Sequence, residues 1–213
     1  MRLSFLFGPV AFVAITTAAS AAHAEDEDDT APTPALPADA TMQLHIDVSS
    51  GLSTLGPQVG GLALVRAGVF EIGPSFDVSG LFSTKAGGGL AMGLGSHGRE
   101  IRSFGWDLLG EVGMHHHHAR KGLLTDDPGA SATIPYAGLR LGLSWALGGP
   151  HAHVRGRHGL WLYGNVDLSS VTKQYAYQEK GWLSDTVRQA EGTTTVGGGT
   201  LFGISYTIGF DAS

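Results

Sequence analysis

Acidic side chains recur at alternate positions in several short segments of the chain, together with one arginine. The residues concerned are Asp47, Glu71, Asp77, Asp107, Glu111, Asp167 and Arg140. Buried charges must be paired, and a guanidinium between carboxylates makes charge-assisted hydrogen bonds that are strong in a medium of low dielectric constant. We therefore predict a salt-bridge network that fills a narrow interior, with a gate or narrow ion path as the functional alternative. Because the acids outnumber the bases in this set, some of them should hold a proton or bind a cation.

Four consecutive histidines, His115–His118, form a second candidate site. Imidazole nitrogens are suitable ligands for zinc, copper or nickel. In an extended run alternate side chains point apart, so each face offers at most two ligands, and Asp126 or Asp127 would have to complete a site. The run falls in a long polar connection that we expect at about residues 114–133. We predict a solvated loop without a cofactor, or a weak zinc or nickel site on that loop.

The elements that must position these residues are short segments in which apolar and polar side chains alternate. A period of two is typical of β-strands, whose successive side chains point to opposite faces. We expect about eight strands, at about residues 42–50, 59–66, 69–83, 88–96, 101–113, 134–147, 160–171 and 201–210. A bulge is expected at Pro74, and a long polar loop at about residues 172–195. The pattern predicts an all-β fold, an eight-stranded antiparallel up-and-down barrel.

The last strand, Leu201–Phe210, shows which face of the barrel points inward. One of its faces carries only large apolar or aromatic side chains, and the other carries Gly203, Ser205, Thr207 and Gly209. Such a strand suits hydrocarbon on one side and a crowded lumen on the other. In the seventh strand, Trp161 and Tyr163 lie on the polar face, where they would fill a narrow lumen beside glycines. We therefore predict a transmembrane barrel over a soluble one of the lipocalin type, and we expect connections one, three, five and seven outside the cell.

The N-terminal region has the composition of an export signal and a linker. Residues 1–24 combine a positive start, an apolar run and an Ala-His-Ala end, which predicts a signal peptide removed after Sec-type export, with a retained helix as the alternative. Residues 25–41 are acidic and rich in proline and alanine, which predicts a disordered linker. Residues 42–213 then form a single domain.

Two other functional classes are excluded by the sequence. The glycine runs at residues 87–89 and 197–199 are not followed by the Lys-Ser/Thr of a phosphate-binding loop. The net charge of −6 and the absence of a basic, aromatic-rich patch argue against a nucleic-acid partner.

The final strand with its terminal aromatic Phe210 resembles the C-terminal signature of Gram-negative outer-membrane proteins, and the whole segment 42–213 is similar to small eight-stranded barrels of the OmpA/OmpX type. The resemblance implies a location in the outer membrane, with outer-membrane lipid and the barrel-assembly machinery as partners. The sequence departs from the pattern at one point, because Asp211, Ala212 and Ser213 follow the aromatic residue.

The resemblance leaves the role of such a barrel open. We expect a structural or surface-interaction protein whose polar lumen is filled by side chains, with an unidentified surface partner. The alternatives are a narrow ion or solute channel and a lipid A-modifying enzyme, because some small outer-membrane barrels carry histidine, serine and an acid near the outer lipid boundary. The chain has Asp126 and Ser131 near the histidine run, but no histidine–serine pair at the sequence spacing of such enzymes.

Overall fold

A computed structural model gives the fold of the chain. The residues that it describes are 42–81, 83–98, 102–119, 127–147, 154–180 and 187–212. The predicted signal peptide, residues 1–24, and the predicted linker, residues 25–41, lie outside the described residues, as does Asp126.

The secondary structure of the described residues consists of β-strands. They are β1 Gln43–Ser53, β2 Gly56–Ala67, β3 Phe70–Gly80, β4 Thr84–His97, β5 Phe104–Ala119, β6 Ala130–Ala146, β7 Val154–Asp167, β8 Ser170–Lys180, β9 Val187–Gly197 and β10 Thr200–Ala212. No helix in this part of the chain is long and apolar enough to cross a membrane.

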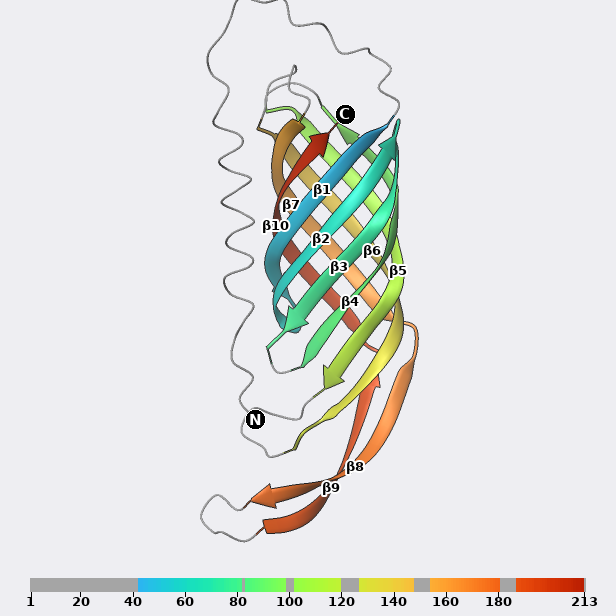
Figure 1. Cartoon of the computed structure of the whole chain (residues 1–213), viewed down its shortest axis with the longest axis vertical. Coiled ribbons are helices and arrows are strands. Elements are labelled where there is room, and N and C mark those ends of the chain that lie inside the picture. The colour runs from blue at the N-terminus through green and yellow to red at the C-terminus, as the bar shows by residue number, and fades with distance from the viewer. Residues whose placement is uncertain are drawn as a thin grey trace, which may run out of the picture. The chain divides into compact units, whose positions relative to one another are not determined.

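Eight of the strands form a closed antiparallel barrel in the order β1-β10-β7-β6-β5-β4-β3-β2 (Figure 1). The first and last strands pair with each other, with Leu44 opposite Ala212 and Ser53 opposite Gly203, and this pairing closes the ring. The predicted eight-stranded antiparallel barrel is therefore confirmed. Because the strand number is even, the start of β1 and the end of β10 lie at the same end of the barrel, which we call the terminal end.

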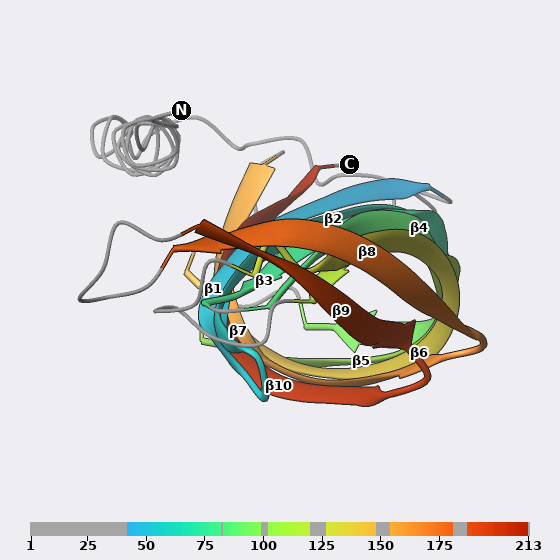
Figure 2. The same cartoon turned by 90° about the horizontal axis from the view of Figure 1, so that it is seen from below.

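A second, two-stranded sheet made of β8 and β9 lies beyond the opposite end of the barrel, which we call the hairpin end (Figure 1). Seen from this end, β8 and β9 cross in front of the barrel (Figure 2). The prediction of a long loop at residues 172–195 was wrong, because most of this segment forms an antiparallel hairpin in which Val171 pairs with Val196 and Lys180 with Val187. The side chains of β8 are largely exposed on both faces. Such a strand shows no apolar alternation, and its signal in the sequence is the high β-propensity of Val, Thr and Tyr.

Most barrel strands extend further than their apolar patterns indicated. The largest extensions are those of β5, which continues to Ala119, of β4 and β6, which begin at Thr84 and Ala130, and of β7, which begins at Val154. Most of the added residues are polar, alanine or glycine, so they contribute few large apolar side chains to the pattern, yet they keep the alternation of faces. The histidine run therefore belongs to β5, and the prediction of a loop from Met114 to about Thr133 is corrected.

Local geometry at the β2–β3 turn and at Pro74 gives one confirmation and one correction. Gly68 in the turn between β2 and β3 has a φ of 63°, a conformation that glycine adopts without strain and that the predicted tight turn requires. No bulge forms at Pro74, because β3 pairs with β2 in the same register before and after it, with Val65 opposite Ile72 and Leu62 opposite Ser75.

The barrel is apolar outside and polar inside. Large apolar side chains of all eight strands are exposed, whereas the polar side chains between them are buried. β2 departs from the prediction, since its marker residues Leu62 and Leu64 point into the lumen and Val59 and Val65 point outward. This strand was misassigned because it carries apolar residues on both faces.

Large lumen side chains lie opposite glycines on neighbouring strands, as expected for a narrow interior. Trp161 on β7 is the register partner of Gly142 on β6, and Tyr163 is the partner of Gly203 on β10. A Cβ atom at Gly203 would lie 1.9 Å from the Tyr163 hydroxyl oxygen. Only glycine leaves room for the tyrosine ring at this level.

Candidate functional site

The seven residues of the predicted lumen network all point into the barrel and are at most 7% exposed. They do not form one network around Arg140, because their charge partners divide them among three groups along the lumen. We call these groups the terminal cluster, the central cluster and the distal pair, in the order in which they follow from the terminal end.

The terminal cluster joins seven of the eight barrel strands. It consists of His45, Asp47, Arg66, Glu71, His97, Asp107, Arg157 and Asp211. The Arg66 guanidinium donates to Glu71, with Nε at 2.5 Å from Oε1, and lies 3.4 Å from Asp107 Oδ1. Arg157 Nη1 lies 3.4 Å from Asp211 Oδ2 and also contacts the backbone carbonyl oxygen of Gly98. Two guanidiniums thus face four carboxylates.

Two histidines of the terminal cluster each lie between two carboxylates. His45 Nδ1 is 2.5 Å from Asp211 Oδ1, and its Nε2 is 3.1 Å from Asp47 Oδ2. His97 Nδ1 is 3.2 Å from Asp211 Oδ2, and its Nε2 is 2.7 Å from Asp107 Oδ1. Both imidazoles therefore direct the same nitrogen, Nδ1, at the Asp211 carboxylate.

The central cluster is built around the ion pair of Arg140 and Glu111. The Arg140 Nε donates to Glu111, and Arg140 Nη2 lies 3.2 Å from Glu111 Oε1. The same carboxylate accepts hydrogen bonds from the hydroxyls of Ser75 and Tyr136. Asp77 Oδ1 lies 3.6 Å from Arg140 Nη2, so Arg140 bridges β6 to β5 and β3. Asp107 and Asp167, which we expected beside Arg140, have other partners.

The distal pair joins Lys85 and Asp167 near the hairpin end. Lys85 Nζ lies 2.8 Å from Asp167 Oδ1 and 2.7 Å from Oδ2. Both side chains are buried, and the Asp167 carboxylate also accepts a hydrogen bond from the backbone nitrogen of Gly199, at 3.3 Å. The pair thereby connects β4 to β7 and to Gly199, the residue that precedes β10.

An apolar layer separates the terminal cluster from the central cluster. Its members are Leu62, Leu64, Ala91, Leu109 and Trp161, all at most 4% exposed. On β5, Leu109 lies between Asp107 of the terminal cluster and Glu111 of the central cluster. The indole nitrogen of Trp161 donates to Asp47 Oδ2 at 3.0 Å, so the layer is fixed to the terminal cluster.

The basic residues that balance the lumen acids were missed in the sequence. Arg66 is the last residue of a predicted strand whose apolar alternation is weak. Lys85 and Arg157 fall in segments whose composition indicates connections between strands. A signal was present in the period of two, because residues two positions apart in a strand point to the same face. Lys85 is followed two positions later by Gly87, and Arg157 by Gly159, both of which point inward. The excess of acids inferred from the sequence is correspondingly smaller in the structure.

The four histidines of the run alternate across the wall of β5. His115 is buried, stacks on Tyr136 at 3.7 Å between ring centroids, and lies with Nε2 3.3 Å from Asp77 Oδ1. His116 points outward and lies 3.3 Å from Thr133 Oγ1. The strand therefore divides the run between the lumen and the outside, and a zinc or nickel site on His115–His118 stays a prediction.

Outside the barrel wall, His118 and Ser131 form a hydrogen-bonded pair across β5 and β6. His118 Nδ1 lies 2.8 Å from Ser131 Oγ. The sequence did not reveal this pair because the two residues are 13 positions apart and come together only through strand pairing. A histidine beside a serine hydroxyl is the arrangement of a nucleophile and its base.

The β8–β9 hairpin is attached to the extensions of β5 and β6. Ala130, Ile134 and Val196 form a small apolar cluster, against which Tyr175 packs. The Tyr175 hydroxyl donates to Asp127 Oδ1 at 2.6 Å, and this hydrogen bond raises the pKa of Tyr175 above its ordinary value. Lys173 Nζ donates to the backbone carbonyl oxygen of Ser131, which adds a second polar attachment.

The chain has no match in comparisons with protein-family models, curated proteins or solved structures.

Proposed function

We propose that the protein is an outer-membrane β-barrel with a structural or surface-interaction role and a lumen closed by side chains. The observation that carries the proposal is the reversal of the usual distribution, with charges buried and large apolar side chains exposed on all eight barrel strands. Monomeric water-soluble proteins rarely expose apolar patches larger than a few hundred Å². Strands of 11 to 17 residues are long enough for a tilted crossing, which needs about 9–11.

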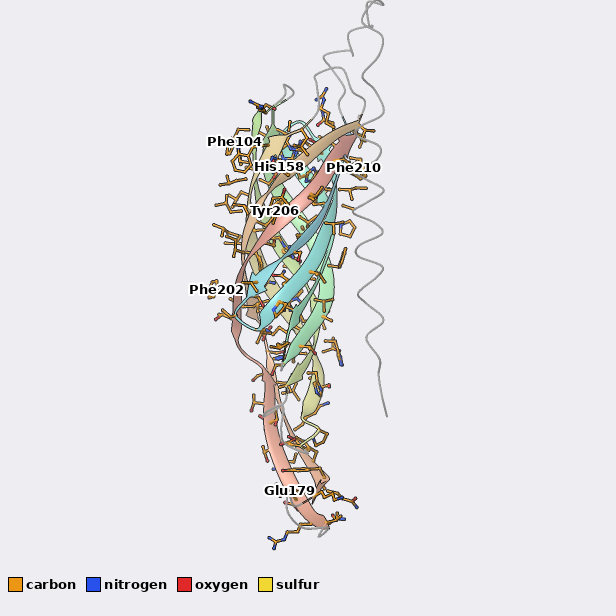
Figure 3. All side chains as sticks on the ribbon, turned by 90° about the vertical axis from the view of Figure 1, so that its left-hand side faces the viewer. Phe104, His158, Glu179, Phe202, Tyr206 and Phe210 are labelled. Atoms are coloured by element: carbon orange, nitrogen blue, oxygen red, sulfur yellow. The ribbon has the colours of Figure 1, made fainter. Side chains whose placement is uncertain are left out.

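Aromatic rings on the outer wall support a membrane boundary near the terminal end. Phe104 and Trp145 meet edge to face at 5.9 Å, Trp145 lies 5.9 Å from His158, and His158 lies 6.1 Å from Tyr206. These rings form an arc across β5, β6, β7 and β10, and Figure 3 shows Phe104, His158 and Tyr206 on this part of the wall. Aromatic belts of this kind lie at the membrane–water interface.

The orientation that we propose places the terminal end in the periplasm and the β8–β9 hairpin outside the cell. On the outer face of β5, the apolar series ends at Met114 and is followed by His116 and His118, which bond to Thr133 and Ser131. We place these polar side chains outside the hydrocarbon core of the membrane. Small bacterial barrels have short periplasmic turns and longer outer connections, which matches the hairpin at this end.

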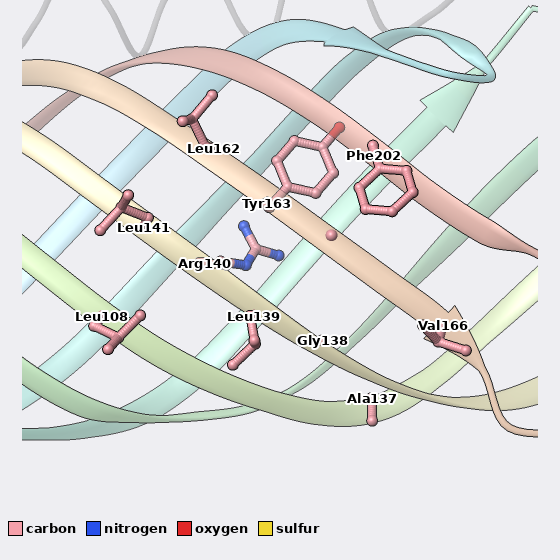
Figure 4. Close-up of a pocket in the computed structure, with 11 residues that line it drawn as sticks. Leu108, Ala137, Gly138, Leu139, Arg140, Leu141, Leu162, Tyr163, Val166 and Phe202 are labelled. Atoms are coloured by element: carbon pink, nitrogen blue, oxygen red, sulfur yellow. The ribbon is translucent and has the colours of Figure 1, made fainter.

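An open groove on the outer wall supports contact with acyl chains. It has a volume of about 690 Å³, and Leu139, Leu162 and Phe202 are among its apolar lining (Figure 4). Gly164, on the outward face of β7, has no side chain and leaves space beside the Phe202 ring. Arg140 and Tyr163 border it from the lumen side and are at most 5% exposed, so the groove presents almost no polar group to its contents.

The test of the architecture is cell fractionation with heat-modifiable gel mobility. We expect the protein in the outer-membrane fraction, with a folded band that shifts on boiling. Recovery in the soluble periplasm would refute the proposal. In planar bilayers we expect no stable conductance, because the apolar layer and both charged clusters occupy the lumen, and a reproducible open channel would favour the channel alternative.

The His118–Ser131 pair favours lipid A modification as a second candidate function. The pair lies on the outer wall just beyond the apolar series of β5, where an acyl ester of a membrane lipid could reach the serine hydroxyl. The histidine would accept the proton of Ser131 as the hydroxyl attacks the ester carbonyl, and would return it to the lipid alcohol that leaves when the ester C–O bond breaks. Water would then hydrolyse the acyl-serine and release the fatty acid. Incubation with lipopolysaccharide followed by mass analysis of lipid A tests this second function. It is supported if lipid A loses an acyl chain with the wild type but keeps it with Ser131→Ala. Unchanged acylation with the wild type would refute it.

A further inference from the structure

The terminal cluster contains a group of three residues whose possible metal-binding atoms lie close together. His45 on β1, His97 on β4 and Asp211 on β10 offer two imidazole nitrogens and a carboxylate oxygen within 4.8 Å of one another. We propose that this group binds a divalent transition-metal ion, with Zn²⁺ as the best fit. Two histidines and one carboxylate, with a water in the fourth position, form an established type of zinc coordination.

The spacing of the donor atoms suits a tetrahedral ion. Zinc–ligand distances of about 2.1 Å place neighbouring ligands roughly 3.4 Å apart. His97 Nδ1 lies 3.2 and 3.4 Å from the two carboxylate oxygens of Asp211. His45 Nδ1 lies closer to Asp211, at 2.5 Å, so this one contact must lengthen by about one ångström to admit the ion.

Each histidine has a second carboxylate on its other nitrogen. His45 Nε2 lies 3.1 Å from Asp47 Oδ2, and His97 Nε2 lies 2.7 Å from Asp107 Oδ1. Metal-binding histidines usually donate their second ring nitrogen to a carboxylate, which fixes the tautomer that directs a lone pair at the metal. His97 is placed in this way by Asp107. His45 Nε2 lies within ion-pair distance of Asp47, and Asp47 is itself fixed by the indole nitrogen of Trp161.

A neighbouring group, Glu71, His97 and Asp107, also has converging donor atoms but already contains a cation. Arg66 donates to Glu71, and its Nη2 lies 2.9 Å from His97 Nε2 and 3.4 Å from Asp107 Oδ1. At Nε2 the Asp107 carboxylate is the nearer partner. The Nδ1 side has less positive charge, because Arg157 approaches Asp211 only at 3.4 Å.

The charge balance of the terminal cluster favours a cation in this group. Four carboxylates, those of Asp47, Glu71, Asp107 and Asp211, face the guanidiniums of Arg66 and Arg157, and Arg155 is the register partner of Asp211 at the rim. With neutral imidazoles, the carboxylates of the cluster outnumber its guanidiniums, and this negative charge favours a cation beside Asp211. Asp211 is the most exposed of the three ligands, with 10% of its side chain accessible, so an ion can enter from the terminal end.

Zinc titration of the full chain, purified in detergent micelles and stripped with a chelator, tests the proposal. We expect saturable binding of one Zn²⁺ per barrel, and an absorption spectrum of bound Co²⁺ that shows imidazole ligation. His97→Gln and Asp211→Asn should lower the zinc affinity more than 100-fold, and Asp107→Asn about 10–100-fold. Heat-modifiable mobility must show that each variant still forms the barrel.

A matched control separates this site from the histidine run. His116→Ala/His117→Ala removes one histidine from each face of that run and should leave the zinc affinity unchanged. Absence of saturable zinc binding to the intact wild-type barrel would overturn the proposal. So would an affinity that survives His97→Gln and Asp211→Asn, or that is lost only in the control variant.

Discussion

Replacing Arg140 by leucine should strongly destabilise the barrel. Arg140 is 2% exposed, and its guanidinium makes two hydrogen bonds to Glu111 while lying 3.6 Å from Asp77. In Arg140→Leu, Glu111 keeps only its neutral donors Ser75 and Tyr136, so a buried carboxylate loses its counterion. Removing one partner of a buried pair costs about 3–5 kcal/mol, which corresponds to a reduction of the folding equilibrium constant by a factor of more than about 100.

The assay is urea unfolding of protein refolded into detergent micelles or lipid vesicles, with the folded fraction read from gel mobility and tryptophan fluorescence. Arg188→Leu is the matched control, because Arg188 is an exposed arginine on β9 opposite Glu179, and its loss should change the free energy of unfolding by less than about 0.5 kcal/mol. Arg140→Leu/Glu111→Leu should recover part of the loss, since no unpaired carboxylate remains on Glu111. A stability of Arg140→Leu within about 0.5 kcal/mol of the wild type would refute the reasoning.

Three further predictions follow from the lumen and the hairpin. Lys85→Met should cost about 3–5 kcal/mol in the same urea assay, because it leaves the buried Asp167 carboxylate without its counterion, and equal stability would contradict this. Gly203→Ala should lower the folded fraction, because the new Cβ would lie 1.9 Å from the Tyr163 hydroxyl, whereas Gly110→Ala, with its nearest neighbour at 3.7 Å, is the control that should fold normally. The raised pKa of Tyr175 means that its hydrogen bond stabilises the hairpin below pH 10 and is lost as the pH rises through the folded-state pKa. Protease cleavage of the hairpin should accordingly accelerate at alkaline pH in the wild type, and Tyr175→Phe should show no such dependence.

The barrel could be predicted from the sequence because most outward-facing side chains of its strands are large and apolar and alternate with small or polar ones. In β10 the large residues Phe202, Ile204 and Tyr206 alternate with the small residues Gly203 and Ser205. A register shift by one residue would put every one of these side chains on the wrong face, so the pattern specifies the register. The burial of all seven predicted lumen charges follows from the same alternation.

The pairing of the charges could not be predicted in this way. Alternation fixes the face on which a side chain lies, but the partner depends on strand tilt and register, which bring Arg140 on β6 to Asp77 on β3. The β8–β9 hairpin was missed for a different reason, because exposed strands carry polar residues on both faces. His118 and Ser131 likewise become neighbours only once β5 and β6 are paired.

The pairing of β1 with β10 has a consequence for how the barrel forms. Because β1 pairs with β10, the ring can close only after the last strand of the barrel has been synthesised. Contacts between residues so distant in sequence form slowly. Until then both seam strands present unpaired backbone groups that can pair with another chain. The His45–Asp211 hydrogen bond spans this seam, one residue beyond the terminal aromatic Phe210, so it can form only in the final step. Substitution of Asp211 should therefore slow closure, and this residue would serve assembly as well as stability.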